Sequence, residues 1–111
     1  MTTPPDLDRL RRESQCVGVA WFAGAPLQLI SASGQPGDMA WPGWDAVAKV
    51  APMLLREGPT ASPEVLLQLP ATLLLLAERA TGVIAVAVAL TPAGAGVALV
   101  QARMAAAQVS A

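Results

Sequence analysis

The sequence predicts a single α/β domain of the α+β kind, in which helices cover both faces of one sheet. Residues 83–90, VIAVAVAL, have no polar side chain on either alternating set, and a strand that is apolar on both faces must be covered on both faces. Hairpin patterns over residues 16–32 and 72–90 are interleaved with three helix patterns. The 111 residues are 54% hydrophobic, which is enough for one core, so residues 1–111 are expected to form one domain.

The first predicted helix begins near Asp6 and runs to about Ser14. Acidic residues in its first turn favour the positive end of the helix dipole, and Leu7 and Leu10 form a thin apolar stripe. Three arginines stand beside three acidic side chains, so we interpret them as a solvated face, with phosphate or acidic-lipid binding as the alternative. These arginines are Arg9, Arg11 and Arg12.

The first predicted hairpin joins a strand over residues 16–22 to a strand over residues 27–32. A short segment with glycine and proline separates the two strands and suits a turn. In the second strand, alternation is expected to place three residues on one face, namely Leu27, Leu29 and Ser31.

The second predicted helix starts between Asp38 and Trp44 and ends near Glu57, just before Gly58-Pro59. Asp38 could cap an early start, and Pro42 could occupy the first helical position of a later one. One side of this helix is apolar and is expected to pack on the sheet. Its residues are Val47, Val50, Ala51 and Leu54, flanked by Trp44 and Leu55.

The opposite side of the second helix is expected to face solvent or a partner. Asp45 and Lys49 have the spacing and orientation of a favourable ion pair. Trp41 and Trp44 are interpreted as core or rim packing, with contact to another chain as the alternative, because tryptophan is enriched at interfaces. The residues on this side are Asp45, Lys49, Pro52 and Arg56, with Met53 nearby.

Three further strands and a helix complete the predicted order. Residues 65–69 alternate with polar neighbours, so this strand should be half exposed, and Pro70 suits an edge position. Residues 72–77 are as apolar as residues 83–90 and reach them through a short polar turn. The last helix opens at Thr91-Pro92. One face of it carries Val97, Val100, Met104 and Ala107, with Leu99 at the flank.

The composition disfavours several classes of function. The chain has no histidine, no tyrosine and no cysteine pair, and its carboxylates form no close group, so we expect neither enzymatic chemistry nor a metal or other cofactor. Cys16 is interpreted as a small buried residue, because no histidine can activate it as a nucleophile. With a net charge of −1 and no basic patch, nucleic acid is not an expected partner. The loop Gly34-Gln35-Pro36-Gly37 lacks the lysine and hydroxyl residue of a phosphate cradle.

The expected location is the cytoplasm. The first residues show no apolar signal pattern, and a single cysteine fits a reducing compartment. Residues 83–100 carry no charge, but Pro92, Gly94 and Gly96 interrupt the segment, so insertion into a membrane is not expected.

Residues 64–104 carry a strand ending in LQLP, the strand TLLLLA, a hairpin turn, the strand VIAVAVAL, and the segment TPAGAGVALVQARM entering the last helix. In these segments and in its element order, the chain resembles the roadblock / dynein light chain family, which has a longin-like, roadblock/profilin-like α+β fold. The resemblance implies a five-stranded antiparallel sheet in the order 2-1-5-4-3. The two terminal helices would cover one face and the central helix the other.

The resemblance also implies a non-catalytic homodimer that binds or activates a Ras-like small GTPase. The expected dimer edge is Val65, Leu67 and Leu69. The expected partner-binding helix face is Asp45, Lys49, Met53 and Arg56, and insertion of Arg56 as an arginine finger is a further option. One alternative is a structural dimerisation subunit of a bacterial complex without a GTPase. Another is a small-ligand sensor, which the lack of polar pocket lining disfavours.

Overall fold

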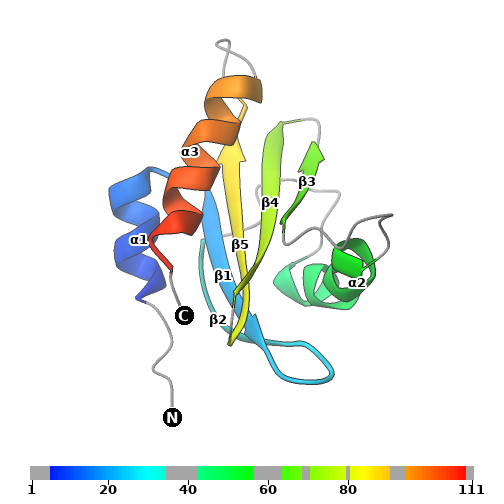
Figure 1. The fold of residues 1–111 in the computed structure, drawn as a ribbon. Coiled ribbons are helices and arrows are strands. Elements are labelled where there is room, and N and C mark those ends of the chain that lie inside the picture. The colour runs from blue at the N-terminus through cyan, green and yellow to red at the C-terminus, as the bar shows by residue number, and fades with distance from the viewer. Residues whose placement is uncertain are drawn as a thin grey trace.

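The computed structural model describes residues 6–34, 43–56, 64–68, 71–79, 81–90 and 95–109, with the backbone alone at Leu54, Arg56 and Ala95. Within these residues the elements follow the predicted order of helix, two strands, helix, three strands and helix (Figure 1). They are α1 (Leu7–Ser14), β1 (Gly18–Ala23), β2 (Gln28–Gly34), α2 (Trp44–Arg56), β3 (Glu64–Gln68), β4 (Thr72–Arg79), β5 (Gly82–Ala89) and α3 (Ala95–Ala107).

The five strands form one antiparallel sheet in the order β2-β1-β5-β4-β3. Helices α1 and α3 cover one face of this sheet and α2 covers the other (Figure 1). The expected fold class, strand order and placement of the helices are therefore confirmed. Strand β5 takes the middle position because a strand with apolar side chains on both faces is stable only between two covering layers.

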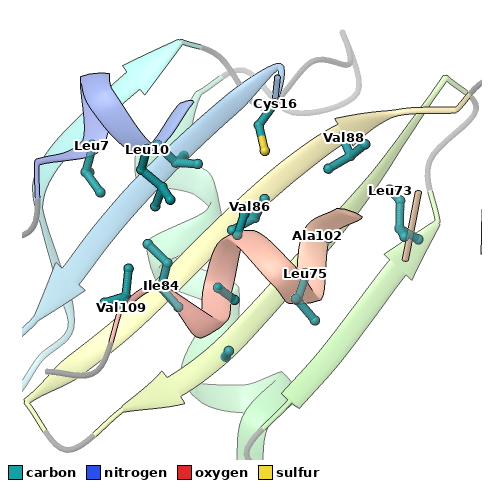
Figure 2. Packing of buried hydrophobic residues seen from close by; sticks show 14 of the residues in the cluster. Leu7, Leu10, Cys16, Leu73, Leu75, Ile84, Val86, Val88, Ala102 and Val109 are labelled. Carbon is teal, nitrogen blue, oxygen red and sulfur yellow. The ribbon is translucent and has the colours of Figure 1, made fainter. Parts of the chain in front are cut away.

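The core layer beneath α1 and α3 is built from the larger side chains of β5. Ile84, Val86 and Val88 point into this layer together with Leu73 and Leu75 of β4 (Figure 2). Helix α3 meets them with small residues, which lets it lie close to a sheet face that is already bulky. These residues are Ala98, Ala102, Ala105 and Ala106, all of which are buried.

The face of α3 that carries its large side chains points away from the sheet. Val97, Val100 and Met104 are each more than half exposed, at 54%, 58% and 66%. Ala107 on the same face is exposed as well. The sequence pattern grouped these residues correctly on one face, and the structure assigns that face to the surface.

In the core layer beneath α2, the small side chains are on β5 and the large ones are on the elements around it. The small side chains Ala85 and Ala87 of β5 leave room for Phe22 and Trp44. These two rings meet edge to face with 6.4 Å between their centroids. The indole N–H of Trp44 donates to the carbonyl oxygen of Gly34 at 3.1 Å, which fixes the start of α2 against β2. The core interpretation of Trp44 is confirmed, whereas Trp41 lies outside the described residues.

One prediction for β2 is wrong, and a β-bulge explains the error. Leu29 packs in the layer beneath α2. Ser31, expected on the same face, pairs with Trp21, which lies in the layer beneath α1 and α3. The register shifts between Trp21 and Phe22, so Ile30 is the extra residue and the alternation of faces reverses there.

Two side chains tie α3 to the rest of the domain. The Gln101 amide donates to the carbonyl oxygens of Ser14 at 2.7 Å and Gln15 at 3.1 Å, which connects α3 to the end of α1. At the end of β4, Arg79 donates from Nε to the Val109 carbonyl at 2.8 Å and from Nη2 to the Ala106 carbonyl at 3.0 Å. Carbonyls at a helix C-terminus lack partners within the helix, so Arg79 acts as a cap for α3.

Candidate interaction surfaces

The outer side of α2 is the first candidate surface. The helix packs on the sheet through an apolar side whose buried residues are Trp44, Val47, Ala48, Ala51 and Leu55. Steps of four residues then bring Asp45, Lys49 and Met53 together on the solvent side, and all three are exposed. Met53 is 59% exposed, so it adds an apolar contact to this otherwise charged side. The side chain of Arg56 lies outside the part that the structure describes.

The ion pair expected between Asp45 and Lys49 does not form. Within the described residues the ion pairs are Arg9–Glu13 and Arg103–Glu64, and neither involves α2. An exposed pair at this spacing contributes only about 0.2–0.5 kcal/mol, so the rotamer entropy lost in fixing the long Lys49 side chain is enough to outweigh it. Both charges on the outer side of α2 are therefore available to a partner.

The outer edge of β3 is the second candidate surface. β3 pairs with β4 along one side, and no strand in the described parts of the chain covers its other side. Val65 and Leu67 are half-buried against the layer beneath α2. Their predicted place on a half-exposed edge strand is therefore confirmed, while Leu69 lies outside the described residues. An edge with unpaired backbone groups and apolar side chains is prone to pair with another strand.

Sequence reasoning missed one exposed residue of this edge. Leu66, between Val65 and Leu67, is 39% exposed and points to the face that carries α1 and α3. The signal was present, because a strand that turns Val65 and Leu67 to one face must turn Leu66 to the other. Beside it, Glu64 accepts from Nε of Arg103 at 3.0 Å, which links β3 to α3.

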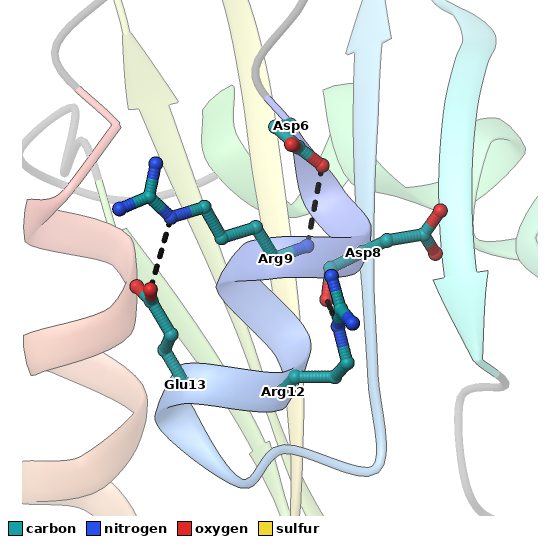
Figure 3. A network of polar contacts seen from close by, with 5 residues as sticks. All are labelled: Asp6, Asp8, Arg9, Arg12 and Glu13. Atoms are coloured by element: carbon teal, nitrogen blue, oxygen red, sulfur yellow. Dashed lines mark hydrogen bonds and ion pairs between the residues drawn. The ribbon is translucent and has the colours of Figure 1, made fainter.

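The arginines of α1 are largely engaged by their own surroundings. Asp6 caps the helix by accepting from the Arg9 amide, and Nε of Arg9 donates to Glu13 at 2.9 Å (Figure 3). The hydrogen bond that Arg9 donates to Glu13 raises the pKa of the Arg9 guanidinium. Nε of Arg12 donates to the Asp8 carbonyl, and Nε of Arg11 donates to the Ser33 hydroxyl at 2.7 Å. These contacts favour the solvated face over an anion site.

The described residues provide few groups for catalysis or metal binding. Burial raises the pKa of the Cys16 thiol to about 11, so this group is protonated and a poor nucleophile near neutral pH. Among these residues no three histidine, cysteine or carboxylate side chains lie close enough to hold a metal ion. No helix within the described ranges is long and apolar enough to cross a membrane.

The element order, the sheet and the division of helices between its faces define a roadblock-like α+β domain. The resemblance noted in the sequence is confirmed at the level of the fold. Among solved structures, MglB from Myxococcus xanthus is similar, with a TM-score of 0.59 over 90% of this chain and 85% of that chain. The sequence identity is 15%, so this likeness concerns the fold alone. No family model and no curated protein sequence matches the chain.

Proposed function

We propose that this chain is a homodimeric regulatory or scaffold module that binds or activates a Ras-like small GTPase. The observation that carries the proposal is the presence of two candidate contact surfaces side by side on a roadblock-like fold. The outer side of α2 exposes Asp45, Lys49 and Met53, and no further strand of the described residues pairs with the outer edge of β3. Proteins in the roadblock family, which the sequence resembles, act as homodimeric partners of Ras-like small GTPases.

The proposed dimer joins two β3 edges about a two-fold axis. Antiparallel pairing of the two edges would extend the sheet across both protomers. Val65 and Leu67 face the side of the sheet that carries α2, so the two α2 helices would lie on the same face of the dimer. Such a contact is isologous, because the same residues serve both copies.

The proposed partner contact lies across the two α2 helices. Asp45 and Lys49 offer one charge of each sign, and Met53 offers a flexible apolar contact that adapts to the partner's surface. Stimulated hydrolysis would come from ordering of the GTPase's own residues, and an inserted Arg56 is the alternative route. The protonated thiol of Cys16 supports a module without chemistry of its own, and a reduced thiol fits action in the cytoplasm.

A structural dimerisation subunit of a bacterial complex, without a GTPase, is the second candidate. The exposed face of α3 favours it, because a scaffold needs a further contact surface on the other side of the sheet. The two candidates agree on the dimer and differ in the partner of α2.

The first test measures the mass of the chain in solution by light scattering. The native chain is expected to be a dimer and Leu67→Asp a monomer, because the substitution places a charge in a largely desolvated contact. Ile30→Asp is the matched control, since Ile30 lies on the opposite edge strand and is 47% exposed. A monomeric native chain, or a dimer that Leu67→Asp leaves intact, would refute the proposed edge.

The second test measures binding to a Ras-like GTPase whose gene lies beside the gene for this chain. The GTPase is loaded with a non-hydrolysable GTP analogue. Lys49→Glu is expected to weaken binding by about tenfold, because it reverses a charge within the contact. Arg12→Glu makes the same charge change on the other face of the sheet and should leave binding unaltered. A dimer that shows no GTPase binding would favour the structural subunit.

A further inference from the structure

The direction in which each backbone group of β3 points follows from the register of the sheet. Just before β4, the carbonyl oxygen of Ala71 accepts from the N–H of Leu90 at 3.0 Å, and this pair continues the register of β4 with β5. In an antiparallel pair of strands, directly opposed residues alternate between those that exchange hydrogen bonds and those that do not. Steps of two from Ala71 therefore identify the residues of β4 that bond to β5, which are Leu73, Leu75 and Ala77.

The intervening residues of β4 turn their backbone groups toward β3. Leu74 lies opposite Leu67, and Leu76 lies opposite Val65. Val65 and Leu67 therefore bond to β4, and the same alternation points the N–H and C=O of Leu66 away from β4. β3 is the last strand on its side of the sheet among the described residues (Figure 1). Leu66, the central residue of β3, thus directs its backbone groups toward the outer edge.

The side chains of β3 form a pattern that a second antiparallel copy matches. Leu66 is 39% exposed on the face that carries α1 and α3, and it does not belong to the core layer there. Val65 and Leu67 lie on the other face, half-buried against the layer beneath α2. The two ends of the strand are polar, with Glu64 and Gln68. Because the sequence is apolar at the centre and polar at both ends, reversing its direction keeps like beside like.

The alternation limits how two β3 strands can pair about a two-fold axis. A residue that points its backbone outward can pair only with another that does so, so the axis lies at Val65, Leu66 or Leu67. With the axis at Leu66, all five residues of β3 pair, Leu66 faces its own copy, and Val65 faces Leu67. With the axis at either neighbour, fewer described residues pair, and Leu66 faces a polar residue, Glu64 or Gln68. Apolar pairs across two strands stabilise a sheet, so the axis at Leu66 is favoured.

We propose that the two-fold axis of the dimer passes between the two copies of Leu66. This inference rests on the proposed dimer and specifies its register. The two Leu66 side chains then cover each other on the face that carries α1 and α3. On the face that carries α2, Val65 of each copy packs beside Leu67 of the other. The contact is therefore apolar on both faces of the joined sheet.

The test is a cysteine scan of β3 in a Cys16→Ala background, with copper phenanthroline as the oxidant and non-reducing gels as the readout. Leu66→Cys is expected to link to its own copy, because opposed residues of this kind have Cα atoms about 5.5 Å apart, within the range of a disulfide. Val65→Cys and Leu67→Cys should each link to their own copies at least about tenfold more slowly. Each is offset from its own copy by two positions, about 7 Å along the strand, which is too far to bridge.

Two controls separate distance from reactivity. Val65→Cys and Leu67→Cys chains that are expressed together should link to each other, because these positions lie opposite one another in the proposed register. Such a link shows that both thiols can react. Ile30→Cys lies at an exposed position of the opposite edge strand and gives the rate of linkage by random collision. Light scattering under reducing conditions gives the mass of each variant before oxidation.

The outcomes distinguish the register from the dimer itself. A dimer in which Val65→Cys or Leu67→Cys links to its own copy faster than Leu66→Cys would refute the register and leave the proposed dimer intact. A dimer in which no cysteine of β3 links faster than Ile30→Cys would refute both the register and the β3 contact. A monomeric chain under reducing conditions would refute the proposed dimer, and the register with it.

Discussion

The orientation of α3 makes a sharp prediction about two neighbouring positions. Ala102 is fully buried against the sheet, whereas Val100, two residues earlier, is 58% exposed. Ala102→Leu forces three extra carbon atoms into a layer that Ile84 and Val86 already fill, and such overpacking costs about 1–3 kcal/mol. Val100→Ser removes an apolar side chain that solvent already reaches, so its effect should stay within about 0.5 kcal/mol.

Urea unfolding followed by circular dichroism measures both changes in the free energy of unfolding. One protein concentration is used throughout, because the stability of the proposed dimer would depend on it. With an m-value of about 1.5 kcal/mol per molar urea, Ala102→Leu should lower the midpoint by roughly 0.7–2 M. Val100→Ser should move it by about 0.3 M or less. If Val100→Ser is the more damaging change, α3 is rotated about its axis relative to this structure, and Val100 faces the sheet.

Two further predictions concern single side chains. Arg79→Met should destabilise the domain by about 1–3 kcal/mol, because the Val109 carbonyl loses its side-chain donor and the Ala106 carbonyl keeps only the Val109 amide. Thermal melting should show a lower Tm, and Arg79→Lys an intermediate one. The folded state raises the pKa of Cys16 from 9.0 to about 11, so it holds the thiol proton more tightly than the unfolded chain does. Stability is therefore unaffected below about pH 9 and falls as the pH rises toward 11, and Cys16→Ala should flatten this part of the profile.

Much of the fold could be predicted because its strongest signals are local. The apolar run in β5 leaves only a central position for that strand, and the period of α2 separates its buried side from Asp45, Lys49 and Met53. These signals depend on the side chains of one element. They require no knowledge of what the element packs against.

The details that sequence reasoning missed depend on contacts between elements. Ser31 lies on the other face because of a bulge opposite Trp21 and Phe22, and no residue pattern within β2 predicts this bulge. Hydrophobicity alone would turn Val100 and Met104 of α3 inward. The opposite arrangement follows from volume, because the bulky face of β5 accepts only small side chains from the helix above it.

The central place of β5 also shapes how the chain must fold. Its two neighbours in the sheet lie at very different distances along the sequence. β4 directly precedes β5, whereas β1 lies near the N-terminus and pairs Gly18 with Ala87. Closing so long a loop is slow relative to forming the β4–β5 hairpin. Until β1 arrives, an uncharged strand rich in valine and alanine has one open edge, which is a template for pairing between molecules. Refolding should therefore lose material to aggregation as the protein concentration rises, even though the folded domain buries residues 83–88 of this strand.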